Sequence, residues 1–517
     1  MNSISCRLCG LLLVAISVHP AIMLGDEPTS ELQFAINDSA GKPQPCRIHL
    51  RDAAGTAQKA PGLPFFKDHF VCPGRVALKL PLGECRYEIE RGPEHQRLSG
   101  MVELRAGRDH VVTEVLGRVA DLSKTGWYGG DLHVHRPVED IELLMRAEDL
   151  HVAPVITWWN QRNLWTGRDI PRELLRQFDG NRFYHVMGGE DERGGGAVLF
   201  FQFDRPLAIA DAKREVPSSA KYVAEIRERD PRVWIDIEKP FWWDVPLWVA
   251  GGKCDSIGIA NNHMCRSQMY PNEAWGRPRD LKQLPDPHGN GYWTQEIYYH
   301  LLNCGVRLPP SAGSASGVLP NPVGYNRVYV NVEGDLTYAK WWDGLKAGRS
   351  FVTNGPLLVC RVNGHLPGHV FTADAGPLEL TFDVSVISND PVQRTEIIHN
   401  GRVIRTIDFD GLITGQVDAT RKVSVKVSES GWFLVRAITN VPHTFRFAST
   451  APFYIELGDR KRHVSRRSAK FFADWVDERI DRLREVVKDE AELRDVLGFH
   501  ESARNFWQDR LVQANAE

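Results

Sequence analysis

Hydrophobic and polar positions alternate at both ends of the chain, in the pattern that is typical of β-strands. Alternating segments separated by Gly, Pro and Asp turns fill residues 31–122 and again residues 356–457. We therefore expect an N-terminal β-sandwich over 26–122 and a C-terminal β-sandwich over 356–460. Over 461–517 the apolar positions recur at helical spacing and predict a helical tail with one apolar face, formed by Phe472, Trp475, Val476, Ile480 and Leu483.

Between these β-rich regions, strand-like and helix-like segments alternate. The strand GGDLHVHR leads into the helical pattern VEDIELLMRAEDL and then into the apolar strand VAPVITWW, and further units of this kind follow. Such alternation is typical of an α/β domain with a largely parallel sheet, either open or closed into a barrel. We expect this domain over 123–355, with its functional groups at the C-terminal ends of the strands.

The first residues carry the pattern of a secretory signal. Arg7 precedes an apolar run from Leu8 to about Val18, and the first acidic residues follow at Asp26 and Glu27. We predict a signal peptide over 1–25 and an exported protein, periplasmic or extracellular. The run is short for a membrane span and no other run approaches one, so no integral membrane segment is expected after cleavage. A short membrane anchor is the alternative.

Charge and cysteine content narrow the possibilities further. The formal net charge is −3 and no basic stripe occurs, so a nucleic-acid partner is not expected. Cys6 and Cys9 lie in the predicted signal, and the other seven cysteines contain no C-x-x-C zinc pattern. One disulfide is predicted within the first β-rich region in an oxidising compartment, among Cys46, Cys72 and Cys85.

The strand GGDLHVHR carries the clearest candidate chemistry. His133 and His135 are two residues apart, so both imidazoles face the same side of a strand and can bind one ion. Two ordinary histidines on a polar sheet face are the alternative. Glu190, Glu238 and His263 also lie at predicted strand ends. With the two histidines they predict a site for one or two divalent transition-metal ions (Zn, Mn or Fe), with Glu190 and His263 as ligands.

Each of these later residues has a second interpretation. Residues 190–192 also read as a solvated acidic turn, Glu238 and Lys239 as a simple ion pair, and His263 as a loop or helix-cap histidine. We assign Glu238 and Lys239 as catalytic candidates, Lys239 as a general acid or electrostatic stabiliser. Asp131 is expected to orient a ligand histidine from outside the site.

Tryptophan is concentrated in the middle of the chain, with ten of its fifteen residues between Trp127 and Trp293. Pairs of tryptophans stand next to the candidate ligands, and indole is a good platform for sugar rings and other amphipathic ligands. Packing in the core or at domain interfaces is the other interpretation. We predict substrate-binding roles for Trp158, Trp159, Trp242 and Trp243.

The motif D-L-H-x-H, from Asp131 to His135, and the β/α units resemble those of the CehA/McbA-type metallohydrolases of the PHP (polymerase and histidinol phosphatase) superfamily. The resemblance covers roughly 127–356. It implies a distorted (β/α)7 barrel flanked by two β-sandwiches, up to three metal ions and the hydrolysis of phosphoesters. The H-x-H of the family matches His133 and His135, and its glutamate after the next strand matches Glu190.

Other motifs of the family are only partly kept. A carboxylate soon after H-x-H matches Glu139 or Asp140. The family's T-D-H-N falls on TWWNQ, 157–161, where two tryptophans replace the acid and the histidine. Its His-Pro falls on KP, 239–240, and its S-D-x-H on SASG, 314–317, where both ligands are missing.

These patterns lead to three functional hypotheses. The first is an exported metal-dependent hydrolase that acts on a phosphoester, another ester or a carbohydrate-derived small molecule through metal-activated water. The second is a non-catalytic protein that binds carbohydrate or another ligand on a degenerate barrel. The third is a lyase on the same scaffold with Lys239 as its base, which the sequence does not distinguish from the first.

Overall fold

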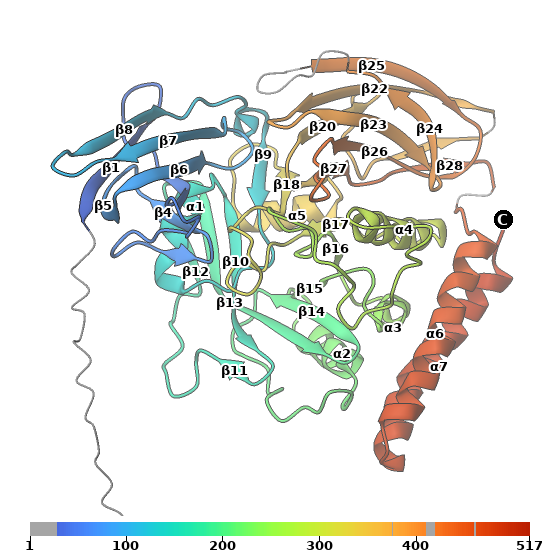
Figure 1. The fold of residues 1–517 in the computed structure, drawn as a ribbon. Helices are drawn as coiled ribbons and strands as arrows, with labels where there is room; N and C mark the ends of the chain where they lie inside the picture. The colour runs from blue at the N-terminus through green and yellow to red at the C-terminus, as the bar shows by residue number, and fades with distance from the viewer. Residues whose placement is uncertain (1–27, 375, 410–418, 460–461) are drawn as a thin grey trace, which may run out of the picture.

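The computed structural model describes residues 28–374, 376–409, 419–459 and 462–517 (Figure 1). The signal peptide predicted over 1–25 lies outside the described residues, together with Cys6 and Cys9. Strands account for 37% of the structure and helices for 21%, so sheets dominate the fold. Two β-rich regions lie next to each other at one end of the molecule, and the central region and a helical hairpin extend from them (Figure 1).

The N-terminal region consists of two sheets that share one hydrophobic core. In the first strand Leu32, Phe34 and Ile36 are buried at every second position, as a strand with one face on a core requires. One sheet has the order β5-β1-β8, from Arg75–Pro81, Thr29–Asn37 and His110–Val115. The other has the order β3-β4-β2-β6-β7, from Phe65–Phe66, His69–Cys72, Cys46–Arg51, Gly83–Glu90 and Leu98–Leu104.

The central region is built on a mixed sheet with few covering helices. Its strands are β9 (Trp127–Gly130), β10 (Val152–Trp159), β11 (Arg162–Asn163), β12 (Leu175–Phe178), β13 (Arg182–Arg193), β14 (Gly196–Phe201), β15 (Trp234–Ile237), β16 (Ser256–Ala260), β17 (Pro310–Ala312), β18 (Arg327–Asn331) and β19 (Ser350–Thr353). Its helices are η1 (Leu122–Thr125), η2 (Val138–Asp140), α1 (Ile141–Ala147), α2 (Ser219–Arg229), α3 (Val245–Gly251), α4 (Gly289–Asn303) and α5 (Tyr338–Lys346). A cluster of buried aliphatic and aromatic side chains fills its interior.

The expectation of a (β/α)7 barrel is wrong. Strand β10 pairs in parallel with β9 and β13, and β15, β16 and β17 are parallel neighbours, but β13–β14, β14–β15 and β18–β19 are antiparallel. The chain passes from β13 to β14 through Gly194 and Gly195 instead of a helical crossover. The sequence pattern indicated strands and helices correctly in several places. It did not show which strands are joined by tight turns, and turns of this kind produce antiparallel pairing.

The C-terminal β-rich region continues from the central sheet. Strand β19 pairs with β27, and β27 pairs with β26, which also pairs with β28 and β23. Strands β20, β22 and β25 form a separate three-stranded sheet over the same core. Its strands are β20 (Leu357–Val362), β21 (Val370–Ala373), β22 (Leu378–Ile387), β23 (Val392–His399), β24 (Arg402–Ile407), β25 (Ala419–Val427), β26 (Gly431–Thr439), β27 (Phe447–Thr450) and β28 (Phe453–Leu457).

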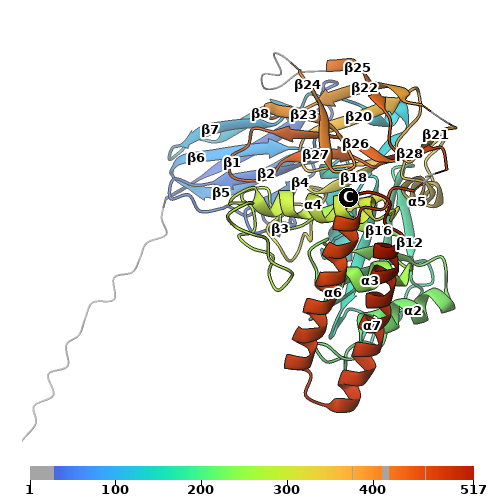
Figure 2. The same ribbon diagram turned by 90° about the vertical axis from the view of Figure 1, so that its right-hand side faces the viewer.

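The chain ends in a helical hairpin of α6 (Arg466–Val486) and α7 (Glu490–Val512), which lie side by side in Figure 2. The hairpin packs on α3 and α4 of the central region. All five residues of the predicted apolar face, Phe472, Trp475, Val476, Ile480 and Leu483, are buried. Within the described residues, no helix has both the length and the apolar composition needed to cross a membrane.

Candidate metal centre

The segment that follows β9 places the two histidines of the H-x-H motif between two neighbouring strands. Val134, which separates them, bridges in parallel to Val155 of β10 on one side and to Ser316 on the other. The chain after β17 passes very close at Gly313, where an added Cβ would lie 2.4 Å from the Cβ of His133. A side chain at this position would displace the histidine, so the close approach requires glycine.

Asp131 fixes the backbone of this segment. Its side chain is fully buried and accepts hydrogen bonds from the backbone N–H groups of His133 (3.0 Å), Ser314 (3.0 Å) and Gly324 (2.6 Å). Burial raises the pKa of Asp131, and these donors act in the opposite direction. Asp131 was expected to orient a ligand ring, and its observed contacts hold the main chain that carries the ring.

Three side-chain atoms converge at the end of this segment. The Nε2 atoms of His133 and His135 are 3.0 Å apart, and Glu190 Oε2 lies 3.5 Å from the first and 3.1 Å from the second. His133 and Glu190 are buried, while His135 is partly exposed. Glu190 Oε2 is also shielded from solvent and accepts no hydrogen bond of normal geometry. The sequence prediction that these three residues meet thus corresponds to one compact set of atoms.

The spacing of these atoms fits a metal ion. An ion bound tetrahedrally at about 2.1 Å separates its ligand atoms by about 3.4 Å, and the three measured separations lie within about 0.4 Å of this value. Two imidazoles and one carboxylate form a ligand set that zinc and iron both accept. The buried oxygen of Glu190, which accepts no hydrogen bond of normal geometry, is the atom that such an ion would satisfy.

Glu238 contacts His133 at Nδ1, the ring nitrogen that does not face Glu190. Its Oε1 lies 3.2 Å from His133 Nδ1, its Oε2 accepts a hydrogen bond of 2.8 Å from Trp242 Nε1, and both oxygens bind Lys239 Nζ. A hydrogen bond from Nδ1–H to this carboxylate leaves the lone pair of His133 on Nε2, toward Glu190. Glu238 and Lys239 therefore pair with each other and, through Glu238, fix the tautomer of a candidate ligand.

The carboxylates and imidazoles of the site shift each other's pKa values in the direction opposite to the effect of burial. Burial disfavours the imidazolium of His133, but the carboxylates of Glu190 and Glu238 raise its pKa to about 10. The pKa of His135 is lowered, chiefly by burial. Burial alone would raise the pKa of Glu190, but the two imidazoles hold it well below the usual range. A metal ion would take the place of the proton that now balances the acidic groups.

Glu192 is a neighbour of the site that the sequence analysis did not select. It lies two residues beyond Glu190 on β13, and its pKa is raised to about 8 by burial and by the charges of Glu190 and Glu238. Asp191 points to the opposite face and pairs with Arg193. Residues 190–192 thus belong to a buried strand, and the E-x-E spacing, the same as that of H-x-H, was the available signal.

His263 lies close to the site but does not join its converging atoms. It is buried, its ring stacks on Tyr270 at 4.5 Å between centroids, and its Nδ1 has no hydrogen-bond partner. Burial lowers its pKa well below the usual value, and the charge of Lys239 acts in the same direction. Among the described residues, the cluster of ligand atoms contains only His133, His135 and Glu190.

The four tryptophans predicted to bind substrate have different surroundings. Trp158 is buried against Phe200, Trp242 is buried and bonded to Glu238, and Trp243 packs edge-on against Trp475 of the helical hairpin. Trp159 is partly exposed, and its ring centroid lies 5.1 Å from that of His135. Trp159 and His135 together form the accessible edge of the candidate metal centre.

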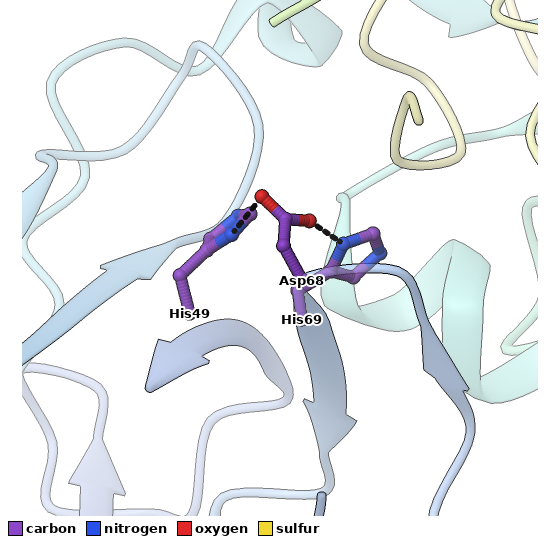
Figure 3. Close-up of side chains that lie close together, drawn as sticks. All are labelled: His49, Asp68 and His69. Atoms are coloured by element: carbon purple, nitrogen blue, oxygen red, sulfur yellow. Dashed lines mark hydrogen bonds and ion pairs between the residues drawn. The ribbon is translucent and has the colours of Figure 1, made fainter. Parts of the chain in front are cut away.

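A second cluster of two histidines and a carboxylate occurs in the N-terminal β region (Figure 3). Asp68 lies between the two rings, with one oxygen 3.2 Å from His49 Nδ1 and the other 3.0 Å from His69 Nδ1. On the far side of the first ring, Arg47 Nε donates a hydrogen bond of 3.0 Å to His49 Nε2. His49 must therefore carry its proton on Nδ1, where Asp68 accepts it.

The residues of this second cluster form a chain of hydrogen bonds that runs from Arg47 through His49 and Asp68 to His69. Arg47 also pairs with Glu90 and Glu148, so a fixed positive charge stands beside the imidazoles. Burial lowers the pKa of His49 to about 4 and that of His69 to about 3, and the charge of Arg47 acts in the same direction. A bound cation would have to displace the proton of His49 beside this guanidinium, so the cluster fits a structural role.

Comparison with known proteins does not identify a function, so the functional argument rests on the residues of the candidate metal centre. No protein-family model matches the chain, and no curated protein matches it. Among solved structures, a Streptococcal ancillary pilin is similar with 16% identity, over 22% of this chain and 38% of that chain, at a TM-score of 0.16. A similarity of this size carries no argument about fold or function.

Proposed function

We propose that the protein is an exported hydrolase that binds a divalent transition-metal ion through His133, His135 and Glu190. The observation that carries the proposal is the convergence of two imidazole nitrogens and one buried carboxylate oxygen that accepts no hydrogen bond of normal geometry, with separations of 3.0–3.5 Å. Phosphoesters and other esters are the substrates implied by the resemblance to the CehA/McbA-type metallohydrolases. When bound, a Zn, Mn or Fe ion supplies Lewis acidity and an activated water.

The residues of the chain have distinct tasks in this proposal. Glu238 accepts a hydrogen bond from the Nδ1–H group of His133, which leaves the lone pair of Nε2 free for the ion. Lys239 and Trp242 bind the carboxylate of Glu238 and hold it in place. Glu192 lies two residues beyond Glu190 on β13, and burial together with the charges of Glu190 and Glu238 raises its pKa in the metal-free chain. A carboxyl at this position is a candidate general acid for a leaving group.

Access to the centre favours catalysis at one edge of the site. Partly exposed His135 and Trp159 define this edge, and substrate would approach along the indole face. A binding platform made from all four tryptophans has less support because Trp158, Trp242 and Trp243 are packed in the interior. A lyase with Lys239 as its base also has less support, since Lys239 Nζ is bound to both oxygens of Glu238.

The proposal is tested by hydrolysis of chromogenic phosphomonoester, phosphodiester and carboxylic ester substrates, with the chain freed of metal and then reloaded with Zn or Mn. We expect turnover that requires metal and that His135→Ala and Glu190→Gln each reduce by at least about 100-fold. His49→Gln, a change at a buried histidine of the second cluster, should leave turnover unchanged. Equal activity of the metal-free and reloaded chains would contradict the proposal, and bound metal without turnover would favour a binding protein.

A further inference from the structure

Two cysteines of the N-terminal β region lie directly opposite each other. Cys46 begins β2 and Cys72 ends β4, and the two are Cα partners in the antiparallel pairing of these strands. Directly opposed residues of antiparallel strands have Cα atoms about 4.5–5.5 Å apart, within the range that a disulfide spans. Both side chains are fully buried, and the structure holds both as thiols.

The two thiols lie close enough for each to affect the ionisation of the other. Cys72 Sγ also accepts a hydrogen bond of 3.3 Å from the backbone N–H of Gly74. The interaction with Cys46 lowers the pKa of Cys72, and burial raises the pKa of Cys46. Because the Gly74 N–H stabilises a thiolate on Cys72 and the thiolate is the reactive form, we expect Cys72 to attack first.

The third cysteine of the same core has a different neighbour. Cys85 lies on β6, where its cross-strand partner is Val102 of β7. It shares the hydrophobic core with Cys46 and Cys72, so it has similar burial without an opposed thiol. The pairing register thus selects one pair from the three cysteines of this region.

We propose that Cys46 and Cys72 form an intramolecular disulfide when the chain meets a disulfide oxidant, such as oxidised glutathione or a dithiol oxidase. The Cys72 thiolate attacks one sulfur of the oxidant and releases the other as a thiolate, which leaves a mixed disulfide on Cys72. Cys46 then loses its proton and attacks Cys72 Sγ, and the second thiol of the oxidant leaves. The chain loses two protons and two electrons, and the oxidant is reduced to two thiols.

This disulfide would restrain the β3–β4 hairpin, which packs against the segment that carries His133 and His135. The β3–β4 hairpin packs Val71 into the cluster that contains Val134 of the H-x-H segment and Ile141 of α1. Its Phe66 lies under the guanidinium of Arg136, 5.1 Å from the ring centroid. The disulfide would join this hairpin covalently to β2 and restrict its motion relative to the sheet.

The inference is tested on the full chain by thiol counting and peptide mapping. Reduced protein is incubated with a glutathione redox buffer in sub-denaturing urea, which lets the buried thiols exchange, and is then alkylated under denaturing conditions and digested. We expect loss of two alkylatable thiols and one linked peptide pair that contains Cys46 and Cys72. A control with reductant added before alkylation should restore both thiols.

Matched variants decide between this pair and other outcomes. Cys46→Ala and Cys72→Ala should each abolish the linked peptide, while Cys85→Ala, a change in the same core, should retain it. The wild-type result stands even where a variant folds poorly. Full alkylation of every cysteine after oxidation, or a linked peptide that contains Cys85, would overturn the inference.

Discussion

The cluster of His133, His135 and Glu190 and the cluster of His49, Asp68 and His69 contain the same three groups, but the carboxylate occupies a different place in each. In the central cluster Glu190 meets the Nε2 atoms, and a separate carboxylate takes the Nδ1 of His133. In the N-terminal cluster one carboxylate takes the Nδ1 atoms of both rings.

This difference shows that composition and burial do not identify a metal site. What matters is whether lone pairs remain free and converge. In the N-terminal cluster the remaining nitrogen of His49 already accepts a hydrogen bond from Arg47, whose charge opposes a cation. In the central cluster the Nε2 atoms face a buried oxygen that accepts no normal hydrogen bond. We therefore expect the hydrogen bonds around each cluster to decide which of them takes an ion.

The largest expected effect comes from the residue that holds the H-x-H backbone. Asp131→Ala removes the acceptor of three buried backbone N–H groups, those of His133, Ser314 and Gly324. We expect a loss of about 3–5 kcal/mol in the free energy of unfolding, together with loss of metal binding. Urea unfolding checks this prediction, with Asp131→Asn, which keeps one acceptor oxygen, as the milder control. A loss below about 1 kcal/mol would show that water or local rearrangement satisfies these groups.

A second effect is a pH dependence of folding stability that we expect from the N-terminal cluster. The folded-state pKa values of His49 and His69, about 4 and about 3, lie below the ordinary value of 6.5. Between these limits the unfolded chain binds protons that the folded chain does not, so stability falls as the pH falls through this window. Between pH 6.5 and about pH 5 the two histidines together account for about 3 kcal/mol of this loss, and the loss continues toward pH 4.

The pH prediction is checked by urea unfolding of the wild-type chain and of the double variant His49→Asn, His69→Asn between about pH 6.5 and 4. The variant should be less stable at neutral pH, and its stability should fall less steeply as the pH is lowered. Parallel pH curves for the two proteins would mean that folding does not lower the pKa of these imidazoles, and the structural role of the second cluster would lose its main support.

A smaller effect concerns the support of the candidate ligand. Glu238→Gln keeps the size of the side chain but weakens the acceptor for His133 Nδ1–H and leaves Lys239 without its ionic partner. We expect the metal affinity to fall by about 10–100-fold, with the ligands themselves in place. Competition with a chromogenic chelator measures this change. Trp242→Phe, which removes only one hydrogen bond to Glu238, should have a weaker effect, and equal affinities in all three proteins would contradict the supporting role.

Part of the candidate site could be predicted from the sequence, because the two-residue repeat of a strand depends only on neighbouring residues. H-x-H predicts two rings on one side of the chain, and the structure brings Glu190 to the same place. The same rule applied to Glu190 and Glu192 would have indicated a buried strand with two acidic side chains on one face. A run of acidic residues also fits an exposed turn, so the local pattern does not distinguish the two.

Other features depend on contacts between distant segments. The position of His263 beside Tyr270 and the burial of Trp243 against Trp475 follow from how loops and the helical hairpin pack. The second cluster joins His49 of β2 to Asp68, which precedes β4, through strand pairing that local patterns do not reveal. The expected barrel was wrong for a similar reason, since the direction of β14 depends on the short turn at Gly194 and Gly195.

Metal stoichiometry distinguishes the two clusters, of which we expect the central one alone to hold an ion. The wild-type chain, the double variant His135→Ala, Glu190→Gln and the double variant His49→Ala, His69→Ala are each incubated with Zn or Mn, dialysed and measured by elemental mass spectrometry. We expect about one equivalent in the wild type and in the second variant, and none in the first. A wild-type chain without metal, or a loss of metal only in the second variant, would mean that the central cluster is not the metal site.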